Sequence, residues 1–224
     1  LMKKFKTLIF LLFCFSATAQ NTLPKGFVYV ENVIPSIMSD LRYNGSNNFV
    51  GTPIDGYHRE VVILTKAATI ALKNVQDELH DYNLSVMVYD AYRPQRAVNH
   101  FVSWAKDLSD TLMKKEFYPD IPKSKLFQLG YIASKSGHTR GSTVDLTIVS
   151  LKTGKELDMG SPYDFFGVQS HPFYKKITTI QKRNRLFLRR IMLENGFKPY
   201  DSEWWHFTLK DEPFPKKYFN FPVK

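Results

Sequence analysis

The sequence SGHTRGSTVDLTIV, residues 136–149, joins a glycine-flanked loop to a run of β-prone residues. Residues 144–149 are typical of a short strand, and Asp145 falls at its start. His138 lies in the preceding loop, where Gly137 and Gly141 give the backbone conformational freedom. We expect this loop to curl the His138 imidazole and the Asp145 carboxylate toward one point. By itself the His–Asp pair is weak evidence for a metal site, because loops contain such pairs by chance.

The flanking elements do not follow a regular alternation of strand and helix. In chain order, the sequence predicts a helix capped by Thr65, a strand over 84–89, a helix over 95–108, the strand over 144–149, a helix over 175–195 and a strand over 203–209. The basic residues expected on the exposed face of the last helix are Lys182, Arg183, Arg185, Arg189 and Arg190. This order predicts a single α+β domain, with helices packed on a mainly antiparallel sheet.

The run Glu203-Trp204-Trp205-His206 supplies a third candidate metal ligand and a candidate base. Catalytic zinc typically takes three protein ligands, and His138, Asp145 and His206 are suitable N and O donors. Glu203 could take a proton from water, as general bases do. On a regular strand residues three apart face opposite ways, so this role needs a bent or bulged strand. The alternative is that the tryptophans are core and Glu203 is a solvated edge residue.

The run Tyr89-Asp90-Ala91-Tyr92-Arg93-Pro94 follows the strand over 84–89. Arg93 stands between the strand end and Pro94, which restricts its backbone. A fixed guanidinium there could stabilise negative charge that develops on a carbonyl oxygen. The alternative is a surface arginine that pairs with Asp90.

The first twenty residues have the three parts of a secretory signal peptide. Lys3, Lys4 and Lys6 precede an apolar run over 8–15, and Ala17-Thr18-Ala19 supplies the small residues of a cleavage site. The apolar run is shorter than the roughly 20 residues that span a bilayer. We therefore expect a signal peptide over 1–20, a domain over 21–224, export to a bacterial periplasm, and no stable membrane insertion after the signal is removed.

Composition limits the class of protein, the kinds of metal ligand and the classes of partner. Hydrophobic residues make up 43% and charged residues 23% of the 224 residues, which is typical of a folded protein. The only cysteine, Cys14, lies within the predicted signal, so a metal site in the mature chain must use histidines and carboxylates. A basic exported protein meets anionic envelope polymers and substrates with free carboxylates, and we expect no nucleic-acid partner. The sequence gives no indication of an oligomeric state.

Taken together, these motifs resemble the zinc D-alanyl-D-alanine dipeptidases, which include the vancomycin-resistance dipeptidases. The family patterns Ser-x-His-x-x-Gly-x-x-x-Asp and Glu-x-Trp-His are met at 136–145 and 203–206. Segments over 40–57 and 159–166 also resemble the dipeptidases. The wider relatives, D,D-carboxypeptidases and hedgehog-type domains, share the zinc pattern without the 40–57 block. Thr143 departs from the family, where a smaller alanine is expected.

The resemblance implies one zinc ion (Zn²⁺) per chain, bound in a cleft of the domain. The residues that it implies are His138, Asp145 and His206 as zinc ligands, Glu203 as catalytic base and acid, Arg93 as the group that stabilises the tetrahedral intermediate, Ser136 and Asp164 at the substrate termini, and Tyr43 and Tyr57 in the pocket lining.

The expected activity is hydrolysis of D-Ala-D-Ala or a similar small D,D-dipeptide to free amino acids. Export favours a role in cell-wall turnover or salvage over antibiotic resistance, which would act on the cytoplasmic dipeptide. One alternative is a D,D- or L,D-carboxypeptidase that trims peptidoglycan stem peptides, and the discriminator is whether the Tyr43 block closes one end of the cleft. The other is a zinc-containing binding module without chemistry, against which the presence of Glu203 and Arg93 argues.

Overall fold

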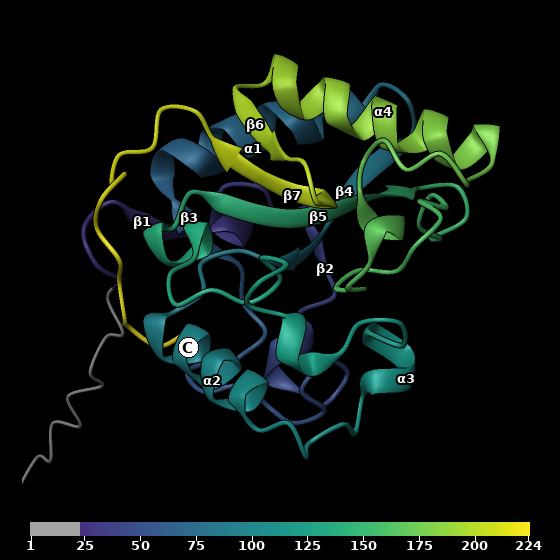
Figure 1. Cartoon of the computed structure of the whole chain (residues 1–224). Coiled ribbons are helices and arrows are strands. Elements are labelled where there is room, and N and C mark those ends of the chain that lie inside the picture. The colour runs from purple at the N-terminus through teal and green to yellow at the C-terminus, as the bar shows by residue number, and fades with distance from the viewer. Residues whose placement is uncertain (1–22) are drawn as a thin grey trace, which may run out of the picture.

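The computed structural model describes residues 23–224, and the signal peptide predicted over 1–20 lies outside this part of the chain. A five-stranded sheet with the order β2-β4-β5-β7-β6 forms its centre (Figure 1). The β2–β4 pair is parallel and the other three pairs are antiparallel. The strands are Met38–Ser39 (β2), Leu84–Asp90 (β4), Thr143–Ser150 (β5), Phe197–Tyr200 (β6) and Glu203–Leu209 (β7). The predicted α+β fold with a mainly antiparallel sheet is confirmed.

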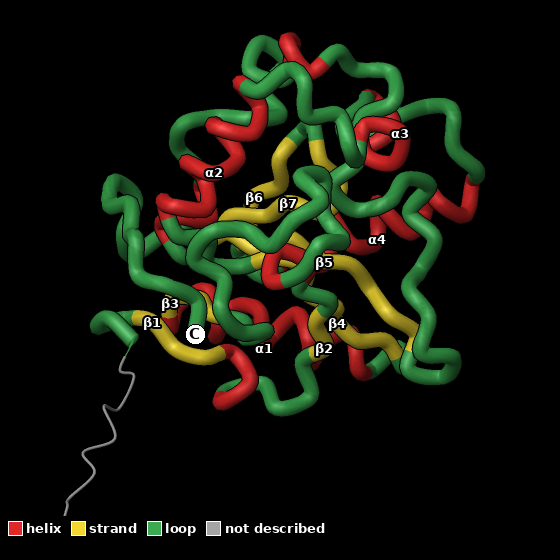
Figure 2. Tube along the Cα trace, turned by 90° about the horizontal axis from the view of Figure 1, so that it is seen from below, coloured by secondary structure: helices red, strands yellow, loops and turns green. Residues whose placement is uncertain are grey.

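Helices cover both faces of the sheet. The helices α1 (Lys66–His80) and α4 (Thr179–Glu194) lie on one face, while α2 (Gln95–Lys106), α3 (Lys114–Phe117) and long loops lie on the other, which Figure 2 shows from below. A two-stranded sheet of β1 (Phe27–Tyr29) and β3 (Ile63–Thr65) leads directly into α1. Within residues 23–224, no helix has the length and apolar character needed to cross a membrane.

The helix α1 begins where the sequence predicts. Thr65 is its N-cap, and Thr65 Oγ1 accepts a hydrogen bond from the backbone N–H of Ala68 at 3.3 Å. Its buried apolar residues are Ala68, Leu72, Val75 and Leu79. Gln76 lies on the same face, and its side-chain oxygen accepts the backbone N–H of Val86 at 2.9 Å. The helix is therefore fixed to β4, the strand that leads to the candidate site.

Two helices differ from their predicted bounds because of local side-chain hydrogen bonds. The helix α4 begins after Thr178 instead of at 175, since Thr178 and Gln181 form a capping box at 3.2 and 2.9 Å. The helix α2 ends at Lys106, because Asp107 leaves the helical region and its carboxylate accepts hydrogen bonds from the turn that follows. In both cases a polar side chain offers the backbone a partner outside the apolar pattern.

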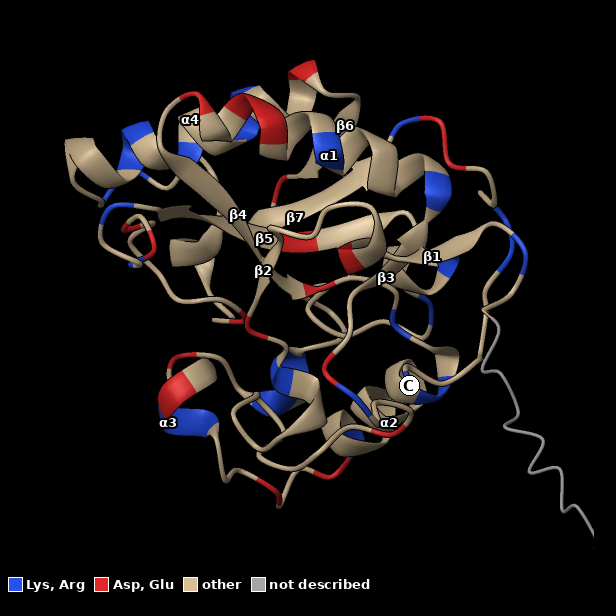
Figure 3. Cartoon of the chain, turned by 180° about the vertical axis from the view of Figure 1, so that it is seen from behind, with Lys and Arg blue, Asp and Glu red and all other residues tan. Residues whose placement is uncertain are grey.

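Arg185 corrects the prediction that the basic residues of α4 are all exposed. Its side chain is buried and donates hydrogen bonds to the carbonyl oxygens of Met159, Gln169 and His171. Burial lowers the pKa of the Arg185 guanidinium to about 10. Arg185 thus holds the loop over 159–171 against α4, while Figure 3 shows further basic positions along this helix in blue.

Candidate active site

Three predicted ligands meet at the centre of the sheet. His138 lies in the 3₁₀ turn Gly137–Arg140, whereas Asp145 in β5 and His206 in β7 face each other in the strand register. His206 Nδ1 lies 3.0 Å and His138 Nε2 lies 3.2 Å from Asp145 Oδ1, and the two imidazole nitrogens are 3.3 Å apart. The structure therefore brings one carboxylate and two imidazoles, distant in the sequence, to a single point.

The turn that carries His138 is fixed at both ends. Ser136 Oγ accepts the backbone N–H of His138 at 3.3 Å, and Gly141 closes the turn with a φ of 81°. A side chain at position 141 would collide with the ring of Phe27. His138 Nδ1 lies 2.7 Å from the carbonyl oxygen of Ala91, which assigns the proton to Nδ1. His138 Nε2 is then free to accept, and burial lowers the pKa of this imidazole.

The donor set fits a zinc ion. Tetrahedral zinc with bonds of roughly 2.0 Å has ligand atoms about 3.3 Å apart, close to the three distances found here. Asp145 Oδ1 is buried and accepts no hydrogen bond from the described residues, although two imidazole nitrogens surround it. Burial by itself would raise the pKa of Asp145, but the two imidazoles hold it below its usual range. A buried, ionised oxygen without a hydrogen-bond donor needs another partner, and a bound cation would supply it.

Glu203 reaches the same point because β7 is bulged. Tyr200 of β6 pairs with Glu203, whereas the preceding residue, Pro199, pairs with Phe207. The β7 residues between Glu203 and Phe207 therefore have no β6 partners. This bend places Glu203 Oε2 3.4 Å from His206 Nδ1. Burial raises the pKa of Glu203 to about 7, opposed by the attraction of His206. A carboxyl group poised near neutrality is suited to proton transfer.

Arg93 is held rigidly beside the triad. Arg93 Nε donates to Asp90 Oδ2 at 2.8 Å, and the other oxygen of Asp90 accepts the hydroxyl of Tyr57 at 2.7 Å. The guanidinium lies 5.3 Å from the ring centres of Tyr43 and Phe101. Arg93 pairs with Asp90 as the alternative reading expects, but only 14% of its side chain is exposed. It is therefore an oriented cation in the site, and its role there stays a prediction.

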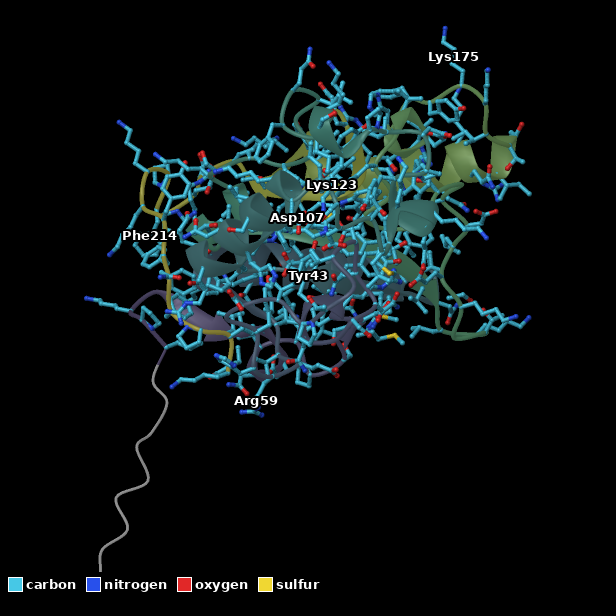
Figure 4. The ribbon with its side chains drawn as sticks, turned by 60° about the horizontal axis from the view of Figure 1, so that its bottom comes forward. Tyr43, Arg59, Asp107, Lys123, Lys175 and Phe214 are labelled. Carbon is cyan, nitrogen blue, oxygen red and sulfur yellow. The ribbon has the colours of Figure 1, made fainter. Side chains whose placement is uncertain are left out.

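The predicted substrate residues Tyr43 and Asp164 form a buried pair. Tyr43 is 2% and Asp164 7% exposed, and the Tyr43 hydroxyl donates to Asp164 Oδ2 at 2.7 Å. Figure 4 shows Tyr43 among the interior side chains, whereas Arg59 and Lys175 lie at the periphery. Asp164 has a φ of 60°, and burial raises the pKa of its carboxyl group well above the ordinary value. The closure of one end of the cleft by the 40–57 block stays a prediction.

The sequence patterns gave no role to Tyr163. Its hydroxyl lies 3.1 Å from the Tyr43 hydroxyl and 3.3 Å from Asp145 Oδ2, so it joins the buried pair to the candidate ligand set. Tyr163 stands inside the family-like segment over 159–166, which was the available signal. Tyr57, predicted to line the pocket, is itself buried against Asp90, and its lining role stays a prediction.

A cleft of about 230 Å³ opens beside the triad. Its lining includes the predicted residues Arg93, Ser136 and His206. Tyr131 and Tyr200 also line it, and they lie in segments without any periodic pattern. The cleft is smaller than the roughly 300–1,000 Å³ of pockets for drug-sized ligands, so it suits a small molecule.

Comparison with known proteins agrees with the resemblance in the sequence. The family model described as D-ala-D-ala dipeptidase matches residues 24–224. A D-alanyl-D-alanine dipeptidase of Enterococcus faecalis is 41% identical over 201 residues, which are 90% of this chain and 100% of that protein. One of Streptomyces coelicolor is 40% identical over 197 residues, covering 88% and 98%.

Among solved structures, the zinc-bound vancomycin-resistance D,D-pentapeptidase VanY is similar with a TM-score of 0.42 and 12% identity, over 67% of this chain and 74% of that chain. The family model and the sequence relatives extend over nearly all of the described residues. This chain therefore belongs to the D-Ala-D-Ala dipeptidase family.

Proposed function

We propose that the protein is a zinc-dependent dipeptidase that hydrolyses D-Ala-D-Ala, or a similar small D,D-dipeptide, to free amino acids. The observation that carries the proposal is the convergence of His138, Asp145 and His206 beside Glu203. Membership of the D-Ala-D-Ala dipeptidase family and the names of its relatives support the substrate.

One zinc ion per chain, held by His138, Asp145 and His206, would supply Lewis-acid chemistry at the scissile carbonyl. Glu203 accepts the proton of the attacking water and delivers it to the leaving amine, because its pKa of about 7 lets it hold and release a proton near neutrality. Arg93 stabilises the charge on the carbonyl oxygen, and its pairing with Asp90 fixes it in advance of the reaction. Charge stabilisation by a preoriented group requires no reorganisation when the charge forms.

The family model and the sequence relatives favour a dipeptidase over a carboxypeptidase. The free amine of a dipeptide would bind at the carboxyl group of Asp164, which accepts the hydroxyl of Tyr43. An ammonium group beside Asp164 would favour its ionised form and lower its pKa. A longer stem peptide has a neutral amide in place of that amine and would lose this attraction.

We expect the purified domain to release D-alanine from D-Ala-D-Ala, and to cleave L-Ala-L-Ala and a stem pentapeptide at least about 10²-fold more slowly. An amino-acid release assay with and without a chelator measures this. Chelation should abolish the activity and added zinc should restore it, since the proposed chemistry depends on the ion. Cleavage of the pentapeptide alone would indicate a carboxypeptidase instead, and an inactive zinc-loaded protein would indicate a binding module.

The protein is proposed to act outside the cytoplasmic membrane, in salvage or turnover of cell-wall dipeptides. The composition of residues 1–20 supports export. Fractionation of cells that produce the full chain should recover the protein, shortened by about 20 residues, from the periplasm. Recovery of the uncleaved chain in the cytoplasm would contradict this localisation.

A further inference from the structure

The charged side chains that line the cleft beside the triad are all cationic. They are Arg93 and Lys135, and no aspartate or glutamate lines the cleft. Arg93 is compensated by Asp90, at 2.8 Å. Lys135 has no carboxylate within 4.0 Å among residues 23–224. The cleft thus carries an uncompensated positive charge.

The position of Lys135 is defined by its surroundings. Gln95 Nε2 donates to the carbonyl oxygen of Ser134 at 3.0 Å on one side of it. On the other side, the Ser136 side chain caps the turn that carries His138. The Lys135 ammonium lies 5.1 Å from the ring centre of Tyr218, on the C-terminal segment. The charge is therefore held at the cleft by an anchored backbone and by an aromatic face.

The positive charge of Lys135 stands beside hydrogen-bonding groups of the same cleft. The exposed Lys135 lines the cleft next to Ser136. A free dipeptide carries an ionised carboxylate at its C-terminus, which the ammonium of Lys135 would attract.

We infer that Lys135 is a specificity-determining residue, whose ammonium binds the free C-terminal carboxylate of the dipeptide alongside the hydroxyl of Ser136. The inference rests on the proposed function and deepens it. Because His206 lines the same cleft, a dipeptide held there by its carboxylate has its peptide bond beside the triad. Lys135 selects substrates with an ionised C-terminus over those whose terminus is neutral.

The test compares D-Ala-D-Ala with its C-terminal amide, which has the same shape but no negative charge. Lys135→Gln should raise KM for D-Ala-D-Ala by about fivefold, the upper range for a solvent-accessible ion pair. It should leave KM for the amide within about twofold of wild type. Lys135→Arg should restore the wild-type KM, and Lys135→Glu should raise KM for the acid further. Lys152→Gln, at an exposed lysine outside the cleft, is the matched control.

The outcomes separate this inference from the function on which it rests. Loss of the acid-over-amide preference in Lys135→Gln, with kcat changed less than about twofold, supports the carboxylate contact. Equal effects on both substrates would indicate a structural role for Lys135 and overturn the inference, as would an unchanged KM for the acid. A wild-type enzyme that fails to hydrolyse D-Ala-D-Ala would overturn the proposed function and this inference with it.

Discussion

Replacing Glu203 by glutamine is expected to lower kcat for D-Ala-D-Ala by about 10³-fold while zinc stays bound. The substitution keeps the size of the side chain but removes the group that accepts and returns the proton, and such groups contribute roughly 10² to 10⁴ in rate. Glu203 Oε2 approaches His206 Nδ1 only to 3.4 Å, and it is not one of the three atoms that converge on the candidate metal position. Its loss should therefore affect proton transfer and leave the affinity for zinc intact.

Steady-state kinetics and the zinc content of the same preparations measure the two halves of this prediction. Glu194→Gln, at an exposed residue at the end of α4, controls for the loss of one negative charge elsewhere. Retained turnover in Glu203→Gln would assign the base to another residue. Loss of the metal would show that Glu203 is a ligand.

Replacing His206 by alanine should remove both zinc and activity. One of three protein donors disappears, and we expect zinc to bind at least about 10²-fold more weakly and hydrolysis to fall below detection. His206 is the most accessible of the three side chains, with 18% exposed, so the fold should tolerate its truncation better than that of His138 or Asp145. The variant thus separates metal binding from folding.

Zinc affinity is measured by competition with a chromogenic chelator, after circular dichroism has confirmed that the variant is folded. His58→Ala, which removes an exposed imidazole just after the 40–57 block, should bind zinc and hydrolyse substrate as wild type does. A folded His206→Ala protein with unchanged zinc affinity would refute the assignment of this residue as a ligand.

The elements with a strong local signal could be predicted from the sequence. The cap Thr65 and the apolar spacing behind it locate α1, and the aromatic-rich run over 203–209 coincides with β7. The strands β1, β2, β3 and β6 are two to four residues long, too short to show a period. The burial of Arg185 depends on the carbonyl oxygens of a distant loop, which no pattern along α4 reveals.

The candidate site also has parts that the sequence could predict and parts that it could not. The residue types of His138, Asp145 and His206 point to a metal, and the family resemblance links them. Their convergence depends on the register between β5 and β7, which the sequence does not state. The bulge that turns Glu203 toward His206 arises from the pairing of β6 with β7. The Glu-x-x-His spacing could therefore show only that a bulge was required. Lys135 lies in a loop without periodicity, and its relation to the cleft appears only in three dimensions.

The hydrogen bond between Tyr43 and Asp164 spans 121 residues, and this long span bears on when the enzyme becomes active. Contacts between such distant parts of a chain require most of it to be ordered first. A complete but unfolded polypeptide therefore contains all the candidate catalytic side chains without an assembled site. If the chain crosses the membrane unfolded, it cannot hydrolyse the dipeptides of the cytoplasm before export, because its site assembles only on folding.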